Sequence, residues 1–364
     1  MFLNVLFNRW IIVFLLLYGS CLVATNDKWI VITSINYPTK AVEKLASLED
    51  WNVVIVADKK TPLDWHFPSV TCLTVEMQKQ LPYRIAKLLP WNHYCRKNIG
   101  YLYAIEHGAC IIYDTDDDNI LCTDILSHLP ERCLLPSVAT KGPVFNPYAY
   151  FGQPTVWPRG YPLEYIHTAN FSVTEPLPSR SLIQSGVVDN DPDIDAIFRL
   201  TRELPIFFDK KPAISLPSGI MAPFNTQNTI FHYDAFWGLL IPMTTPFRVC
   251  DIWRGYWAQR LLWDIGGNVC FAPPEVRQDR NEHNLIRDFE DEIELYCKSG
   301  SLITLLRSWK SVSVNLSDRL CEITQLMIDH GFYGNKEIEL VEAWIADLKD
   351  VGYVIPNINT EDLI

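Results

Sequence analysis

Apolar and polar residues alternate between strand-like and helical patterns through the first third of the chain. Residues 41–48 carry apolar side chains at helical spacing, and residues 96–107 predict a second helix that ends at Gly108. Four short runs rich in apolar and β-branched residues are typical of buried strands: residues 29–35, 52–57, 70–75 and 110–113. This alternation predicts a mostly parallel, doubly wound α/β sheet.

The pattern changes twice further along the chain. Residues 130–178 hold nine of the 24 prolines together with many aromatic residues, which excludes regular helix and predicts a long, packed loop region. From residue 283 onward, apolar residues recur at helical spacing and predict a helical C-terminal module. We therefore expect a leader at residues 1–27, a sheet domain at residues 28–274 and the helical module at residues 275–364.

An apolar segment, Trp10 to Ala24, dominates the predicted leader. It is shorter than the roughly 20 residues of a full membrane span. It fits the core of a signal peptide, and it could act as an uncleaved anchor if the apolar residues before it are recruited. Either interpretation directs the chain to the secretory pathway. The glycosylation sequons at Asn170 and Asn315 support the same destination. A buried helix of a cytosolic domain is the alternative.

Composition and charge exclude several classes of protein. Hydrophobic residues make up 48% of the chain and charged residues 20%, which describes a folded globular protein. The formal net charge of -12 argues against a nucleic-acid partner, because phosphates are neutralised by lysine and arginine. The ten cysteines show no CxxC or metal-finger spacing, and no GxSxG, HExxH, GxGxxG or P-loop motif is present.

Four aspartates in the run DTDDD, residues 114–118, directly follow the last of the apolar runs. A buried strand that ends in acids delivers them to the edge of the sheet where α/β proteins bind ligands. Carboxylates this close repel one another unless a cation lies among them. We therefore expect Asp114, Asp116 and Asp117 to hold Mn²⁺ or Mg²⁺ and a diphosphate. Asp118 is the member for which we expect a solvated position, and a solvated acidic turn is the alternative for the whole run.

Polar residues at other strand and helix ends are candidates for binding a nucleotide. Thr33 follows the core of the first predicted strand, and Asp58 follows the second, where it could accept hydrogen bonds from uracil or ribose. Arg96 and Lys97 begin a predicted helix, where cations oppose the helix dipole, so a phosphate bound there would explain them. A capped turn at Asp58 and a surface position for the Arg–Lys pair are the alternatives.

Two further segments carry residues suited to a sugar. Asp189 and Asp191 lie in an acid-rich loop and could contact sugar hydroxyls, although acids before a helix also serve as caps. The segment DIWRGYW, residues 251–257, combines an acid, an arginine and three aromatic residues. Trp257 could stack on a sugar, Arg254 could bind hydroxyls or phosphate, and Asp251 could act as general base. A core helix with a buried Arg–Asp pair is the alternative.

These segments together resemble the STELLO-type glycosyltransferase family. The resemblance rests on KKTP (59–62), DW (64–65), LPY (81–83), RKNIGYLYAI (96–105), the acids at 114–117, DPD (191–193), DAIFR (195–199), DIWRGYW (251–257) and RSW (307–309). The acid loop and the DIW segment are also faintly similar to plant reversibly glycosylated polypeptides, which act on UDP-arabinose. The resemblance implies a glycosyltransferase-A fold, a nucleotide-sugar donor, a divalent metal at Asp114, Asp116 and Asp117, and a Golgi setting as a type II membrane protein.

The sequence therefore predicts a glycosyltransferase of the secretory pathway that uses a nucleotide sugar, UDP-linked, and an acceptor of unassigned chemistry. We expect its domain in the Golgi lumen if the leader anchors it, or in the ER lumen or outside the cell after cleavage. A non-catalytic Golgi scaffold that keeps the fold and assists assembly of another enzyme complex is the first alternative. A sugar-nucleotide mutase is the second.

Overall fold

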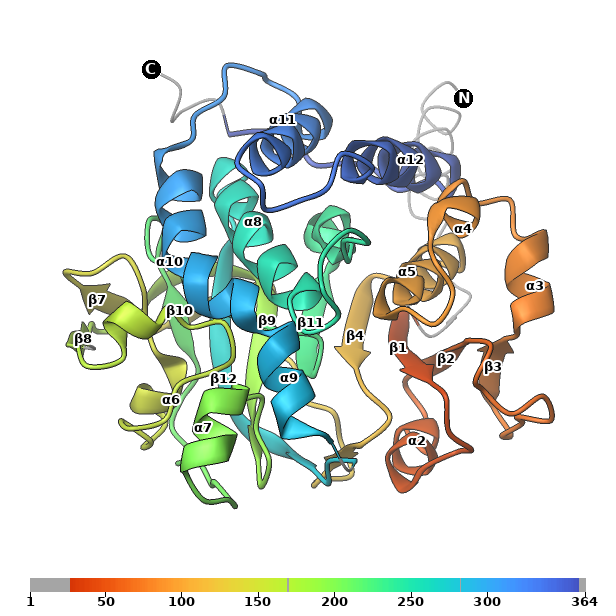
Figure 1. Cartoon of the computed structure of the whole chain (residues 1–364), viewed down its shortest axis with the longest axis horizontal. Helices are drawn as coiled ribbons and strands as arrows, with labels where there is room; N and C mark the ends of the chain where they lie inside the picture. The colour runs from red at the N-terminus through yellow and green to blue at the C-terminus, as the bar shows by residue number, and fades with distance from the viewer. Residues whose placement is uncertain (1–26, 169, 282, 360–364) are drawn as a thin grey trace, which may run out of the picture.

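The computed structural model describes residues 27–168, 170–281 and 283–359. It consists of a large curled sheet with helices packed around it (Figure 1). The predicted signal or anchor segment falls on residues outside this range. In the described part of the chain, we find no helix with both the length and the apolar character needed to cross a membrane.

The first half of the sheet is parallel, as the alternating pattern predicts. Its strands are β1 (Lys28–Ser34), β2 (Asn52–Ala57), β3 (Val70–Leu73) and β4 (Ile111–Thr115), in the spatial order β3-β2-β1-β4. Ile30 pairs with Val53 on one side and Tyr113 on the other. Because β2 and β4 flank β1, the connections run in opposite directions from it, and the crevice between β1 and β4 is the point where α/β sheets bind ligands.

The second half of the sheet continues from β4 through strands of both directions. These are β9 (Leu177–Asp189), β10 (Ile214–Leu216), β11 (Asn228–His232) and β12 (Asn268–Gln278). β11 runs antiparallel to both β4 and β9, and β12 runs parallel to β9. The strands β9 and β12 therefore point the same way as β4. The carboxyl ends of β1, β2, β4, β9 and β12 all reach one edge, which confirms the mostly parallel α/β fold.

Alternate side chains of the parallel strands enter two different cores. On β1, Val31 faces the helix α5 (Lys97–Glu106), whereas Ile30 and Ile32 face the helix α2 (Lys40–Ala46). Thr39 caps α2, because its side-chain hydroxyl accepts a hydrogen bond from the amide of Val42 at 3.3 Å. In α5, a Cβ at Gly100 would come within 2.7 Å of side chains on β1 and β2, so glycine allows this helix to lie close to the sheet.

Short elements fill the remaining connections. They are α3 (Val75–Gln80), α4 (Ile85–Leu88), η1 (Tyr94–Arg96), β5 (Asn119–Leu121), β6 (Arg132–Leu135), β7 (Val138–Thr140), α6 (Pro147–Tyr150), η2 (Leu163–Tyr165), β8 (Phe171–Val173), α7 (Ala196–Thr201) and η3 (Tyr233–Leu239). Between residue 130 and the start of β9 at Leu177, the regular elements of the described residues are three or four residues long, as the proline content predicts.

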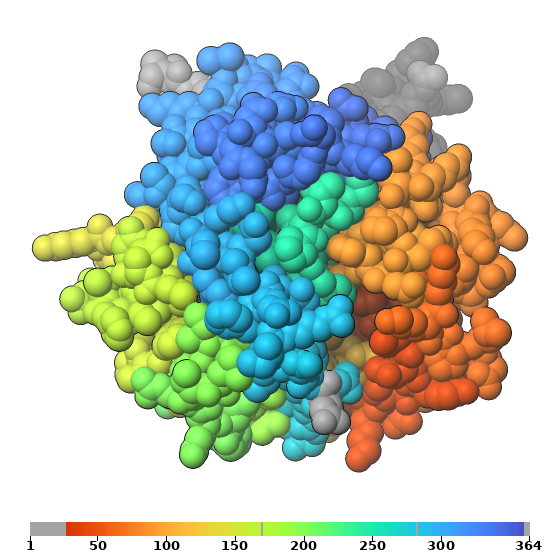
Figure 2. Space-filling model, in the orientation of Figure 1, coloured from red at the N-terminus to blue at the C-terminus, as the bar shows by residue number. Residues whose placement is uncertain are grey.

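The C-terminal helices form where their apolar spacing predicts them. They follow α8 (Cys250–Asp264) and β12, and comprise α9 (Leu285–Asp291), α10 (Ile293–Ser308), α11 (Leu316–Asp329) and α12 (Glu337–Asp350). The N-cap position of α11 is Asn315. In Figure 2 the blue helices lie across the upper part of the molecule, where α10 and α11 contact α8, and α12 contacts α4 and α5.

Asp347 of α12 joins this helical module to the helix α4, beside the first, parallel half of the sheet. Its carboxylate is 1% exposed and accepts hydrogen bonds from the amides of Arg84 and Ile85 at 2.9 and 3.0 Å, at the start of α4. Since α4 is a single turn, these amides have no partner within the helix.

Replacing this carboxylate should therefore destabilise the fold. We expect Asp347→Ala to lower the free energy of unfolding by about 2–3 kcal/mol, because it leaves buried amides unpaired. Asp350→Ala is the matched control, because this acid also pairs with Arg84 but its side chain is 65% exposed. This substitution should lower the free energy of unfolding by less than about 1 kcal/mol. Urea unfolding of both variants gives the comparison, and equal effects would contradict the assignment.

Candidate active site

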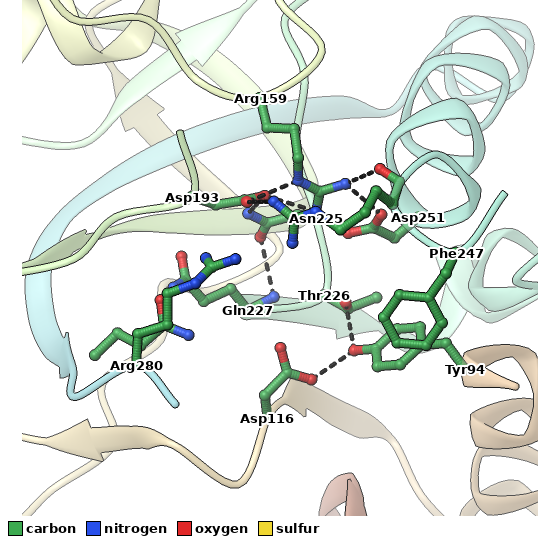
Figure 3. A pocket seen from close by; sticks show the side chains of 12 residues that line it. Tyr94, Asp116, Arg159, Asp193, Asn225, Thr226, Gln227, Phe247, Asp251 and Arg280 are labelled. Carbon is green, nitrogen blue, oxygen red and sulfur yellow. Dashed lines mark hydrogen bonds and ion pairs between the residues drawn. The ribbon is translucent and has the colours of Figure 1, made fainter. Parts of the chain in front are cut away.

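A polar pocket opens outside the carboxyl ends of β4, β9 and β12 (Figure 3). Charged and amide side chains dominate its wall. The residues that line it are Tyr94, Asp116, Arg159, Asp193, Asn225, Thr226, Gln227, Phe247, Arg248, Asp251, Gln278 and Arg280. Of the residues expected from the sequence, Asp116 and Asp251 therefore lie in its wall.

Asp114 lies beneath this pocket as a fully buried ion-pair centre. Its two carboxylate oxygens lie 2.7 Å from Lys97 Nζ and 3.2 Å from Arg254 Nη2, and none of the three side chains has any exposed surface. The structure thus brings together three of the predicted site residues, but pairs them with one another. Asp114 is placed in the protein interior, which differs from the ligand-facing position expected from its sequence.

Asp116 is the acid of the run that faces the pocket, and its side chain is 30% exposed. It accepts a hydrogen bond of 2.5 Å from the Tyr94 hydroxyl and lies 3.4 Å from Lys97 Nζ. Burial and the neighbouring charges of Asp114 and Asp117 raise the pKa of Asp116 to about 6, against the opposing effect of Lys97. A cation bound beside this carboxylate would stabilise its ionised form.

The other two acids of the run have different surroundings. Asp117 is buried and accepts hydrogen bonds from Ser34 Oγ at 2.5 Å and Asn36 Nδ2 at 3.1 Å, which ties the end of β4 to the end of β1. Asp118 is half-buried, which corrects the solvated position expected for it, and accepts a hydrogen bond of 2.9 Å from Gln278 Nε2. Burial and the charge of Asp116 raise the pKa of Asp118 to about 7.

The donor set at this edge suits a cation that the substrate helps to hold. Among residues 27–359, apart from 169 and 282, no group of three or more His, Cys, Asp or Glu side chains is arranged to bind a metal ion. Mg²⁺, however, is commonly bound through one or two carboxylates, with phosphate oxygens and water as the remaining ligands. Asp116 and Asp118, whose pKa values burial raises, are the pair that fits this arrangement.

Arg159 holds the two acids on the opposite wall. Its guanidinium donates to both oxygens of Asp193 at 2.7 and 2.8 Å and to both oxygens of Asp251 at 3.0 and 2.8 Å. Burial opposes the ionisation of Asp193, but the charge and hydrogen bonds of Arg159 outweigh it and hold the pKa of Asp193 well below its usual range. Bidentate pairing of this kind fixes the orientation of both carboxylates.

Two more arginines complete the wall and connect it to the C-terminal module. Arg248 lies 2.7 Å from a carboxylate oxygen of Glu292, which has no exposed side-chain surface. Arg280, just after β12, reaches Asp288 of α9 at 3.4 Å. The sequence analysis missed Arg159, Arg248 and Arg280. Arg159 stands in the proline-rich region and the other two in connecting segments, so no periodic pattern marks them.

Two of the other predicted residues serve the core. Arg96 is 1% exposed, donates to Gln78 Oε1 at 2.7 and 2.9 Å, and stacks on the ring of Trp91. Trp257 is 4% exposed, with its ring centroid 6.2 Å from that of Trp237. Neither lines the pocket.

The remaining four stand at strand ends or in loops around it. Thr33 pairs with Val56 near the end of β1, and Asp58 lies half-buried just past β2. Asp189 accepts a hydrogen bond of 2.9 Å from the amide of Phe208, and Asp191 is ion-paired with Arg199. These four also lie outside the pocket wall.

The curled, mostly parallel sheet, with a polar pocket at its carboxyl edge, defines an α/β protein and is consistent with the glycosyltransferase-A-like fold expected from the sequence. The family model for STELLO glycosyltransferases matches residues 248–364. Two Arabidopsis thaliana proteins, named Probable glycosyltransferase STELLO1 and Probable glycosyltransferase STELLO2, are 34% and 35% identical to the chain over 93% of its length. These matches confirm the resemblance of the chain to the STELLO glycosyltransferases. They cover 46% of each relative, so the chain spans about half the length of these proteins.

The raised pKa of Asp118 predicts a stability that depends on pH. Folded Asp118 keeps its proton up to about pH 7, whereas an unfolded aspartate releases it near pH 4, so ionisation weakens the fold as the pH rises toward 8. In EDTA, Asp118→Asn should raise the free energy of unfolding by about 1–2 kcal/mol more at pH 8 than at pH 5, because the loss of stability runs from about pH 4 to about pH 7. Urea unfolding at both pH values, with the exposed Asp50→Asn as control, measures the difference. The same gain at pH 5 and pH 8 would contradict this interpretation.

Proposed function

We propose that the chain transfers a sugar from a UDP-linked donor to an acceptor, with Mn²⁺ or Mg²⁺ held by Asp116 and Asp118. The observation that carries this proposal is the acid pair at the end of β4, half-buried beside a pocket and with raised pKa values. The glycosyltransferase class of the relatives supports it. When bound, the metal would neutralise negative charge on the leaving diphosphate.

Asp114 and Lys97 act in this proposal by holding Asp116 in place. Asp114 keeps Lys97 beneath the pocket, and Lys97 in turn lies within reach of both Asp116 and the carbonyl oxygen of Thr115, at 2.5 Å from the latter. The end of β4 is thereby fixed, so the acids that follow it need little reorganisation to receive a cation. We assign Asp117 a related part, because it ties this turn to β1.

The nucleotide part of the donor would lie toward β1 and β2. Thr33 and Asp58 belong to the carboxyl ends of these strands, on the same edge as Asp116. Ligands of open α/β sheets bind at this edge, beside the point where the strand order reverses. Asp58 is the residue we assign to the ribose or the uracil.

The sugar and the acceptor would occupy the other side of the pocket. Asp251 lies in its wall, oriented by Arg159, and we assign it the role of general base toward an acceptor hydroxyl. Phe247 lines the pocket and is 50% exposed. The centroid of its ring lies 5.5 Å from that of Tyr94. Its exposed ring presents an apolar face on which a sugar ring can pack.

We also propose a lumenal setting in the Golgi for this domain. The apolar N-terminal segment and the two sequons support it, as described from the sequence. The acceptor, whether glycan or protein, would then be a molecule of the secretory pathway.

Calorimetric titration with UDP tests the proposal. Purified protein should bind UDP in Mn²⁺ and lose most of this affinity in EDTA, and Asp116→Asn should weaken metal-dependent binding about tenfold or more. Asp124→Asn is the control, because Asp124 follows the same acidic run but its side chain is 96% exposed.

Absence of metal-dependent UDP binding to the folded wild-type protein would contradict the proposed function. The scaffold alternative would then gain support if the cellular role of the protein survives Asp116→Asn.

A further inference from the structure

We propose that Arg280, assisted by Arg248, forms an oxyanion subsite in the pocket wall that binds the distal phosphate of the donor diphosphate. The inference rests on the proposed function. It adds a pair of arginine side chains as a second source of positive charge for the diphosphate, beside the proposed metal ion. Arg280 enters the pocket from the end of β12, whereas Asp116 enters from β4 (Figure 3).

The first observation is that Arg280 is buried without being fully bonded. Its side chain is 8% exposed, and its Nε atom has no hydrogen-bond partner among the described residues. The contacts of Nη2 with Asp288 and His283 are both 3.4 Å long. A guanidinium has five N–H donors in a planar fork, so most of the bonding capacity of Arg280 is available to a ligand.

The second observation is that the acids near Arg280 already have other partners. Asp191 is paired with Arg199, and both oxygens of Asp193 are bonded to Arg159. Burial and the charges of Arg199 and Arg248 lower the pKa of Arg280 to about 10. Apart from the long contact with Asp288, the acids near Arg280 are therefore engaged with other cations, and an oxyanion would give its guanidinium a partner of its own.

The third observation concerns Arg248, which is held near the same space by the C-terminal module. Its guanidinium is 2.7 Å from Glu292 and 3.9 Å from Asp193, and it lines the pocket. Glu292 also accepts a hydrogen bond from the amide of Ala196 at 2.8 Å, so its own position is fixed. The module thereby supplies a preorganised cation beside Arg280.

A phosphate of the donor is the oxyanion that the position of Arg280 favours. The amide of Asp279, the residue before Arg280, donates a hydrogen bond of 3.2 Å to the carbonyl oxygen of Asp118. Gln278, two residues before Arg280, donates a hydrogen bond to the same acid. Arg280 is thus within electrostatic range of the proposed cation site, where the diphosphate would lie. A carboxylate on the donor sugar would suit the same fork, and the experiment separates these two sources.

The experiment compares the affinities of the full chain for UMP and UDP by calorimetry in Mn²⁺. We expect the ratio of UDP to UMP affinity to fall about tenfold in Arg280→Met, with UMP affinity nearly unchanged, since only UDP carries the distal phosphate. Arg280→Lys should restore part of the ratio by returning the charge without the fork. Arg277→Met is the matched control, because Arg277 lies in β12, three residues before Arg280, and its side chain is 53% exposed.

An unchanged ratio in folded Arg280→Met, with a melting temperature close to that of the wild type, would overturn the proposal. If the variant instead loses affinity for UDP-glucuronate relative to UDP-glucose while the UDP to UMP ratio is kept, the bound oxyanion is a sugar carboxylate and the phosphate assignment is wrong. If the wild type binds no nucleotide, the proposed function fails. Titration with inorganic pyrophosphate then tests the subsite alone, and binding that Arg280→Met abolishes would support it.

Discussion

A carboxylate buried at the end of β4 is the interaction on which the rest of the site depends. Asp114 has no exposed surface, and an isolated buried charge is destabilising by several kcal/mol unless it is paired. Lys97 from α5 and Arg254 from α8 supply that pairing. Since both helices must reach the same carboxylate, α5 and α8 are fixed relative to β4. The acids beyond Asp114 therefore emerge at the edge of the sheet in a defined position.

Pairing of charges extends from this centre around the whole pocket. Arg159 joins Asp193 to Asp251, and Glu292 of the C-terminal module holds Arg248. Separating the partners of such a pair leaves a buried charge without compensation, which is strongly unfavourable. The side chains of each pair are therefore held in one arrangement. The module therefore supports the pocket wall, through Glu292 and Asp288, as well as the sheet. Preorganised charges of this kind are what transfer of a group from a diphosphate requires.

Local patterns in the sequence predicted β1 to β4, α2, α5 and the C-terminal helices, because spacing of apolar residues reflects burial directly. They also located the acid run at a strand end. They did not reveal which acid is buried, since Asp114 and Asp116 are chemically identical and their different surroundings come from α5 and α8. The partner of Asp114 on α8 is 140 residues away. Arg159, Arg248 and Arg280 were missed because a single arginine in a loop shows no period, and Trp257 was expected at a sugar but packs in the core.

The central claim is that Asp116 and Asp118 hold the cation while Asp114 stays paired with Lys97 and Arg254. Anomalous diffraction at the manganese edge, from crystals grown with Mn²⁺ and UDP, tests it most directly. The account predicts an anomalous peak within coordination distance of Asp116 and Asp118, with the buried ion pairs of Asp114 intact. A peak coordinated by Asp114, with Lys97 or Arg254 displaced from it, would contradict the account.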